Sequence, residues 1–204
     1  QTSVGDNSSD ISSLQSTTST NSSDISALQT KTADMSATTI NGEDAITFDG
    51  VNVYVRSGSG STSGTVNGTG NLIVGYDESR SSGSDKSGSH NLVVGRDHNY
   101  TSYGGIVAGD ENDITANYAS VLGGSNNTAS GLTAVVLSGW NNEASGRRSA
   151  VVSGWENTAS GSYSAVLAGD SNETTASESS IGGGTSVTND SYSEFRAEGS
   201  VTDP

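Results

Sequence analysis

Hydrophobic and polar positions repeat every fifteen residues through the second half of the chain. A short apolar run that leads to a glycine returns at this spacing, and an asparagine closes each phrase. A fixed short period predicts a solenoid, because one coil cannot bury its own apolar face and neighbouring coils must stack. The asparagines that keep this register are Asn112, Asn127, Asn142, Asn157 and Asn172.

Within each run the apolar residues are consecutive rather than alternating, as in Val135-Val136-Leu137. Successive side chains on a strand point to opposite faces, so a run of three needs both faces covered. One face can fill the interior of the coil, and the other needs a partner. We therefore expect coils from separate chains to pack against one another.

A period of seven residues precedes these repeats. Between residues 4 and 35, apolar side chains such as Ile11, Leu14, Ile25 and Leu28 fall on a heptad lattice. This spacing predicts a coiled coil. The apolar seam is thin and contains Asn and Thr, so we expect several chains to share it.

Two asparagines, Asn7 and Asn21, occupy d positions of the heptads, fourteen residues apart. Polar residues at core positions fix the number and alignment of the chains at some cost in stability, and we favour this structural interpretation. The alternative is that a ring of side-chain amides holds an anion on the axis of the coiled coil.

The period changes to two residues near Ile40. Ile46 and Phe48 alternate with polar residues, Asp49-Gly50 supplies a two-residue turn, and alternation resumes at Val51, which together predict a β-hairpin. A Gly- and Ser-rich stretch then predicts a flexible or wrapping connection. The expected division of the chain is a coiled-coil stalk (1–38), a hairpin neck with its connection (39–70), a β-roll (71–184) and a C-terminal cap (185–204).

Composition and charge narrow the class of partner. The net charge is −15 with eight Lys and Arg in total, which argues against nucleic acid and anionic lipid as ligands. The sequence has no Cys and no apolar run long enough to span a membrane, so we expect neither thiol chemistry nor membrane insertion. The Gly- and Ser-rich composition would suit a disordered chain, but disordered segments do not keep a strict period.

The sequence contains no recognisable pattern of catalytic or metal-binding residues, so we expect that the protein is not an enzyme. His90 and His98 are eight residues apart without Cys or clustered carboxylates at metal-ligand spacing, and we interpret both as solvated loop residues. Asp110 and Asp170 follow glycines and Glu111 is next to Asp110, but the glycine-rich calcium repeat is absent. These carboxylates are interpreted as surface groups.

Two tryptophans are stronger candidates for ligand recognition than these histidines and carboxylates. Trp140 and Trp155 occupy the same place in adjacent coils, and stacked coils lie about 4.8 Å apart, so the indoles should form a short ladder. The structural interpretation is a packed aromatic ladder. The functional one is a platform for sugar rings or a partner's apolar surface, with Arg147 and Arg148 supplying donors to acidic groups. A solvated turn explains the arginines nearly as well.

The repeated phrases Asn-Thr-Ala-Ser-Gly and Ser-Val-x-Gly-Gly, over roughly 70–184, resemble the YadA-like head repeats of trimeric autotransporter adhesins. The resemblance implies a homotrimer of left-handed parallel β-rolls, a trimeric coiled-coil stalk and a role in adhesion. It also implies that Asn7 and Asn21 hold a structural chloride; no other cofactor is expected. The repeat is one residue longer than the family's common one, and the stalk precedes the head, which reverses the family's order.

The expected function is therefore attachment. We expect the distal, adhesive part of a trimeric extracellular fibre, of a cell surface or a virion tail, that binds a glycan or protein of a target cell. Recognition would use the turns of the repeat, the insertion at Arg80 or the cap. The alternative is a non-binding spacer of a longer fibre. An ice-binding solenoid is disfavoured, because Glu143 interrupts the aligned Thr128 and Thr158.

Overall fold

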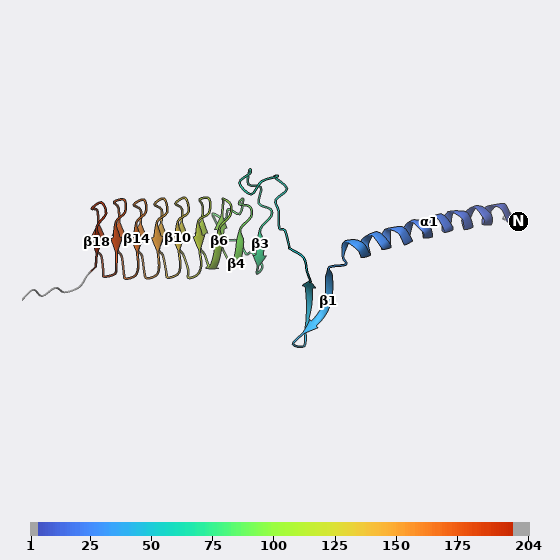
Figure 1. The fold of residues 1–204 in the computed structure, drawn as a ribbon, viewed down its shortest axis with the longest axis horizontal. Coiled ribbons are helices and arrows are strands. Elements are labelled where there is room, and N and C mark those ends of the chain that lie inside the picture. Colours follow the sequence, from blue (N-terminus) through green and yellow to red (C-terminus); the bar gives the residue numbers. More distant parts are fainter. Residues whose placement is uncertain (1–3, 198–204) are drawn as a thin grey trace, which may run out of the picture. The chain divides into compact units, whose positions relative to one another are not determined.

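A computed structural model describes residues 4–197 of the chain. The chain divides into two units, of which the first ends at Tyr54 and the second begins at Val55. The first unit contains one helix and one hairpin, and the second contains a β-solenoid (Figure 1). The elements of the first unit are α1 (Val4–Lys31), β1 (Met35–Ile40) and β2 (Glu43–Phe48).

Helix α1 has no buried side chain within the single chain. Several Ser and Thr hydroxyls donate to the carbonyl four residues earlier, for example Ser12 Oγ to Ser8 O at 2.9 Å, and so use no partner outside the helix. The helix ends at Lys31, so the predicted stalk of 1–38 is too long. Met35 fits the heptad lattice but begins β1, because the run 35–40 pairs with β2. No helix in the described residues is both long and apolar enough to cross a membrane.

The hairpin lies earlier in the chain than predicted. Strands β1 and β2 pair antiparallel around Asn41-Gly42, whose φ angles of 55° and 90° match the two left-handed positions of a type I′ turn. The predicted turn at Asp49-Gly50 is wrong, and residues 51–56 form no strand. Both dipeptides suit a tight turn, but only Asn41-Gly42 has a six-residue strand on each side.

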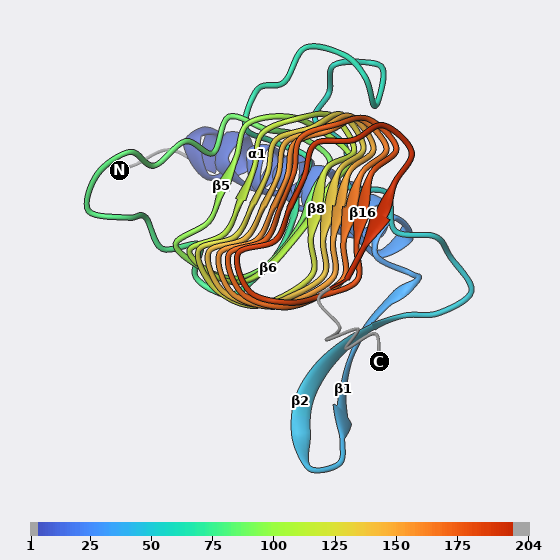
Figure 2. The ribbon, with the colours of Figure 1, turned by 90° about the vertical axis from the view of Figure 1, so that its left-hand side faces the viewer.

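The second unit is a parallel β-solenoid, as the fifteen-residue period predicts. Its coils stack in register (Figure 2), for example Val136 beside Val151 and Ala144 beside Ala159. Two sheets run along the roll, one of nine strands and one of seven. The nine-stranded sheet contains β3 (Leu72–Val74), β4 (Leu92–Arg96), β6 (Ile106–Asp110), β8 (Ser120–Val121), β10 (Val135–Val136), β12 (Ala150–Val151), β14 (Ala165–Val166), β16 (Ser180–Ile181) and β18 (Phe195–Arg196). The seven-stranded sheet contains β5 (Asn99–Tyr100), β7 (Asp113–Ile114), β9 (Thr128–Ala129), β11 (Glu143–Ala144), β13 (Thr158–Ala159), β15 (Glu173–Thr174) and β17 (Thr188–Asn189).

The core of the roll is narrow. The nine-stranded sheet contributes one fully buried residue per coil, such as Val136 or Val151, and the seven-stranded sheet contributes small residues such as Ala144 and Ala159. Small side chains opposite valine let the two sheets approach closely. The interior therefore holds one file of side chains from each sheet, one file of asparagines, and one file of small residues that includes Ala134 and Ser149.

The asparagines of the fifteen-residue register form a buried, hydrogen-bonded ladder. Asn142 donates its backbone N–H and its Nδ2 to Asn127 Oδ1, both at 3.0 Å, and donates Nδ2 to Gly154 O at 2.9 Å. The same contacts recur from coil to coil, for example between Asn157 and Asn142. Because each amide is satisfied inside the roll, the register asparagines are structural residues.

His98 begins this ladder, which contradicts its interpretation as a solvated loop residue. Its side chain is buried, with 1% of the residue exposed, and it stands one coil before Asn112. His90 is half-buried and accepts the backbone N–H of Ser57 on Nε2 at 3.0 Å. The connection around Ser57 thus wraps the first coils of the roll, one of the two behaviours expected of it.

The coils continue past Gly184, where a cap of 185–204 was predicted. Strands β17 and β18 extend both sheets, and Arg196 takes the register position of the buried Ile181. The guanidinium of Arg196 forms ion pairs with carboxylates of this last coil. Asn189 is buried and donates to two carbonyls near the same end. Polar groups thus close the described end of the core, and residues 198–204 of the predicted cap lie outside the described residues.

Candidate binding surfaces on the turns of the roll

Each coil has two turns, and the predicted recognition residues lie on different ones. Trp140 and Trp155 lie on the turn that follows a strand of the nine-stranded sheet, which we call the tryptophan edge. Arg147 and Arg148 lie on the turn that follows a strand of the seven-stranded sheet, which we call the arginine edge. Strand β11 separates Trp140 from Arg148 along the coil, so the structure does not unite the tryptophans and the arginines in one site.

The two indoles contact each other, as their spacing predicted. Trp140 and Trp155 pair as neighbouring bridges, and their ring centroids are 4.6 Å apart with an angle of 49° between the planes. The residues keep 40% and 53% of their surface exposed. The pair is therefore a tilted stack that offers apolar surface to solvent rather than one flat shelf.

Polar residues flank the indoles along the tryptophan edge. The bridge ladder places Ser125 beside Trp140 on one side and Asp170 beside Trp155 on the other. Asp170 accepts a hydrogen bond from Ser171 Oγ at 2.7 Å. Aromatic faces between hydrogen-bonding groups can bind a ring that is apolar on its faces and polar at its rim.

The arginine edge is built from one left-handed residue in each coil. Arg148 and Tyr163 have φ angles of 57° and 60° and occupy the same position in adjacent coils. The backbone N–H of Arg148 donates to Leu132 O at 2.9 Å, and that of Tyr163 donates to Arg147 O at 2.8 Å. These hydrogen bonds join the turns of adjacent coils, so the side chains at equivalent positions line up along the roll.

Tyrosines accompany the arginines on this edge. Arg148 Nη1 donates to Tyr163 Oη at 2.9 Å, and the Cζ atom of Arg148 lies 5.3 Å from the ring centroid of Tyr163. Arg147 Nη1 approaches the same Oη at 3.4 Å. Tyr103 and Tyr118 make an edge-to-face pair at 5.2 Å between ring centroids. Sequence reasoning missed these tyrosines, although Tyr103, Tyr118 and Tyr163 keep the fifteen-residue register.

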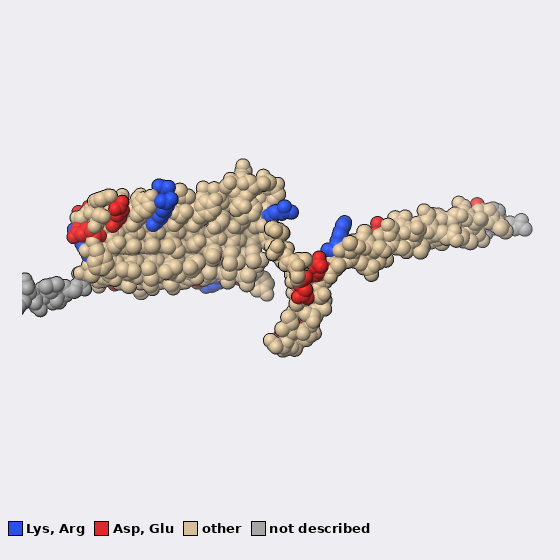
Figure 3. All heavy atoms as spheres, in the orientation of Figure 1, with Lys and Arg blue, Asp and Glu red and all other residues tan. Residues whose placement is uncertain are grey.

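The two arginines of this edge form no ion pair within the described chain, unlike the other cations of the repeats. Their guanidinium contacts are to the hydroxyl of Tyr163. Figure 3 shows how sparse basic side chains are on one face of the roll. The paired cations of the repeats are Arg80 with Asp113, Lys86 with Asp77, Arg96 with Asp110 and Arg196 with Glu194.

The insertion around Arg80, predicted as a recognition loop, is tied to the body of the roll. Arg80 pairs with Asp113 at 2.6 Å and donates Nε to Asp97 O at 2.7 Å. Asp77 pairs with Lys86 and accepts the hydroxyl of Tyr100 at 2.8 Å. Burial and then the Asp77 contact raise the pKa of Tyr100 above its ordinary value. The charged groups of the insertion thus serve internal contacts.

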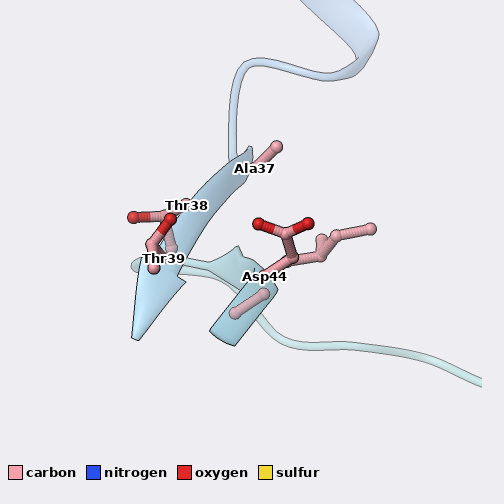
Figure 4. Close-up of a pocket in the computed structure, with 6 residues that line it drawn as sticks. Ala37, Thr38, Thr39 and Asp44 are labelled. Carbon is pink, nitrogen blue, oxygen red and sulfur yellow. The ribbon is translucent and has the colours of Figure 1, made fainter. Parts of the chain in front are cut away.

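The first unit contributes two further features. Asn7 and Asn21 both lie exposed on α1, so an anion held between them requires helices of several chains and stays a prediction. The hairpin has a hollow lined by residues that include Ala37, Thr38 and Asp44 (Figure 4). Asp44 is the one ionisable group among those lining residues. Groups of three or more His, Cys, Asp or Glu able to share a metal ion do not occur within residues 4–197.

Comparison of the chain with protein-family models, with curated proteins and with solved structures gives no match.

Proposed function

We propose that this chain is the adhesive, distal part of a homotrimeric extracellular fibre that attaches to a glycan or protein of a target cell. The roll is the scaffold of the fibre, and the turns of its coils carry the recognition groups. The observation that carries the proposal is the exposed apolar face of the nine-stranded sheet. Association with further copies of the chain would bury this face.

This face runs along several coils. Leu122, Leu137 and Leu167 point outward at the same position of their coils and keep 45%, 39% and 44% of their surface exposed. Val135 and Ala150 add a second, half-buried file beside them. Soluble monomers rarely expose a long continuous apolar surface, so a matching face of another copy is the occupant we propose.

The helix supports the same assembly. The apolar side chains of its heptads, Ile11, Leu14, Ile25 and Leu28, are each at least 55% exposed in the single chain. An amphipathic helix this rich in Ser and Thr gains most of its stability from packing rather than from propensity. The same homo-oligomer covers both the helix seam and the sheet face. The resemblance of the repeats to YadA-like heads favours three chains.

The side chains exposed on the turns support a role in attachment to a target cell. The tryptophan edge presents aromatic surface, and the arginine edge presents cations that have no carboxylate partner among residues 4–197. A trimer carries each edge three times, so weak individual contacts add through avidity.

The oligomeric state is the first test. Sedimentation equilibrium of the chain should give a single species of three times the 20.5 kDa chain mass. A monomer at micromolar concentration would falsify the proposal.

The attachment itself is tested with fluorescent trimer on cells. The Trp140→Ala, Trp155→Ala variant should bind at least tenfold more weakly than wild type. A control is Tyr54→Ala, which removes an exposed aromatic residue of the first unit, outside both edges. Undiminished binding of the tryptophan variant would exclude that edge. A folded wild-type trimer that binds no cell type in the panel would favour the spacer alternative.

A further inference from the structure

The arginine edge has the geometry of a binding site for a single anionic group. We propose that Arg147, Arg148 and the hydroxyl of Tyr163 together bind the carboxylate or sulfate group of an acidic saccharide. The inference rests on the proposed attachment function, because it gives the ligand class that one edge of the fibre recognises.

Three donor groups converge at this point of the roll. Tyr163 Oη accepts from Arg148 Nη1 at 2.9 Å and lies 3.4 Å from Arg147 Nη1. The lone pairs of the Tyr163 hydroxyl accept from the guanidiniums. Its O–H group can therefore donate a hydrogen bond to another acceptor. Each guanidinium has five N–H donors, and the contact to Tyr163 uses one of them. An oxyanion placed here meets donors from all three side chains, in the planar geometry that guanidinium offers to carboxylates and sulfates.

The site also has positive charge that the described part of the chain does not neutralise. Among the described residues, neither arginine forms an ion pair, and the two like charges converge on one hydroxyl. The nearest acid along this edge, Glu178, accepts hydrogen bonds from Tyr192 Oη at 2.9 Å and Ser193 Oγ at 3.2 Å. Because the local acid is engaged elsewhere, a ligand is the available source of a counter-charge.

The surroundings favour a sparsely charged ligand over a dense polyanion. The chain has 23 Asp and Glu against eight Lys and Arg, so a polymer that is charged along its length meets net repulsion from the chain as a whole. Apolar surface lies close by along the same edge, since Leu132 is one coil from the arginines and Tyr118 is two. These residues are 40% and 47% exposed, so a sugar ring has surface to pack on while its charged group reaches the arginines.

Three saccharides with one common core test the inference. Lactose, 3′-sialyllactose and lactose 3′-sulfate are titrated into the assembled full chain, and binding is followed by ligand-observed NMR. We expect one or both of the charged forms to bind and neutral lactose not to bind. A preference between them identifies carboxylate or sulfate as the recognised group.

Variants locate the site. Arg147→Gln, Arg148→Gln should weaken binding of the charged saccharide at least tenfold, and Tyr163→Phe about threefold, because it removes the hydroxyl and keeps the ring. The matched control Lys31→Gln, Arg56→Gln removes the same charge from cations outside the edge and should stay within twofold of wild type.

Equal binding of lactose, absence of binding by both charged forms, or full binding by the double arginine variant would each overturn the inference. Sedimentation and cell attachment, measured on the same samples, report on the proposed function separately. A trimer that attaches to cells but ignores the charged saccharides refutes the inference and leaves the attachment function intact.

Discussion

His98 begins the buried asparagine ladder by accepting the backbone N–H of Asn112 on its Nδ1 atom, at 3.2 Å. Its Nε2 lies 3.0 Å from Val94 O, and because a carbonyl can only accept, Nε2 carries the ring proton. Asn112 makes the equivalent pair of contacts one coil later, through Oδ1 to the N–H of Asn127 and through Nδ2 to a carbonyl four residues earlier. The imidazole thus performs the hydrogen bonding of an asparagine amide.

This equivalence predicts that His98→Asn is tolerated and His98→Leu is not. Asn at this position restores both contacts, whereas Leu leaves Val94 O and the N–H of Asn112 buried without partners. Two such groups cost about 2–4 kcal/mol. Urea unfolding followed by circular dichroism should rank wild type and His98→Asn well above His98→Leu. Equal stability of the two variants would show that the ring acts through packing alone.

The sequence pattern identified the solenoid but not the role of this histidine. His98 precedes Asn112 by fourteen residues, whereas the later asparagines are fifteen apart, and its residue type differs. A search for asparagines at fifteen-residue spacing therefore does not find His98. A search for side chains with one donor and one acceptor, at either spacing, would have found it.

The fifteen-residue spacing also predicted only part of the two candidate edges. The register placed Trp140 beside Trp155, because neighbouring coils align equivalent residues. It did not show that Arg148 lies on the other turn, since that depends on where the short strand β11 falls within a coil. Likewise Asn41-Gly42 and Asp49-Gly50 are similar turn signals, and the pairing of β1 with β2 decides between them.

Strand-end glycines are predicted to be required by the close stacking of coils. Gly139 has a φ of 105°, and a Cβ atom there would lie 2.3 Å from Gly154 O. Gly139→Ala should therefore cost about 3 kcal/mol or more of unfolding free energy. Gly123 is the matched control, because its Cβ would come no nearer than 3.7 Å to Leu137 O, and Gly123→Ala should change stability by less than about 0.5 kcal/mol. Thermal unfolding of both variants measures the difference, and similar losses would contradict the stacking argument.

Tyr100 is predicted to make the roll sensitive to alkali. Its ring is buried, its hydroxyl donates to Asp77, and burial followed by this contact raises its pKa. Below about pH 10 the tyrosine is neutral in both the folded and the unfolded chain, so its contribution to stability is constant. Above that pH the unfolded chain loses the proton first, so the free energy of unfolding falls as the pH rises.

The measurement is urea unfolding of wild type and Tyr100→Phe at several pH values on either side of pH 10. Lys86 and Asp77, which pair with each other, are present in both proteins, so the difference between them isolates the tyrosine. Wild type should lose its advantage over Tyr100→Phe as the pH rises. Tyr76→Phe, at a 94% exposed tyrosine, serves as the control, and a parallel pH profile for wild type and Tyr100→Phe would refute the assignment.

The outer face of the nine-stranded sheet is predicted to hold the chains together. Leu137 and Leu132 are similarly exposed in the single chain, at 39% and 40%, but Leu137 lies on this face and Leu132 lies on the arginine edge. Leu137→Glu places a carboxylate in each copy of the proposed interface, where an unpaired buried charge costs several kcal/mol. Sedimentation should show that this variant dissociates at concentrations where wild type and Leu132→Glu remain assembled. If Leu137→Glu stays fully assembled, or if Leu132→Glu dissociates equally, the chains meet through another surface.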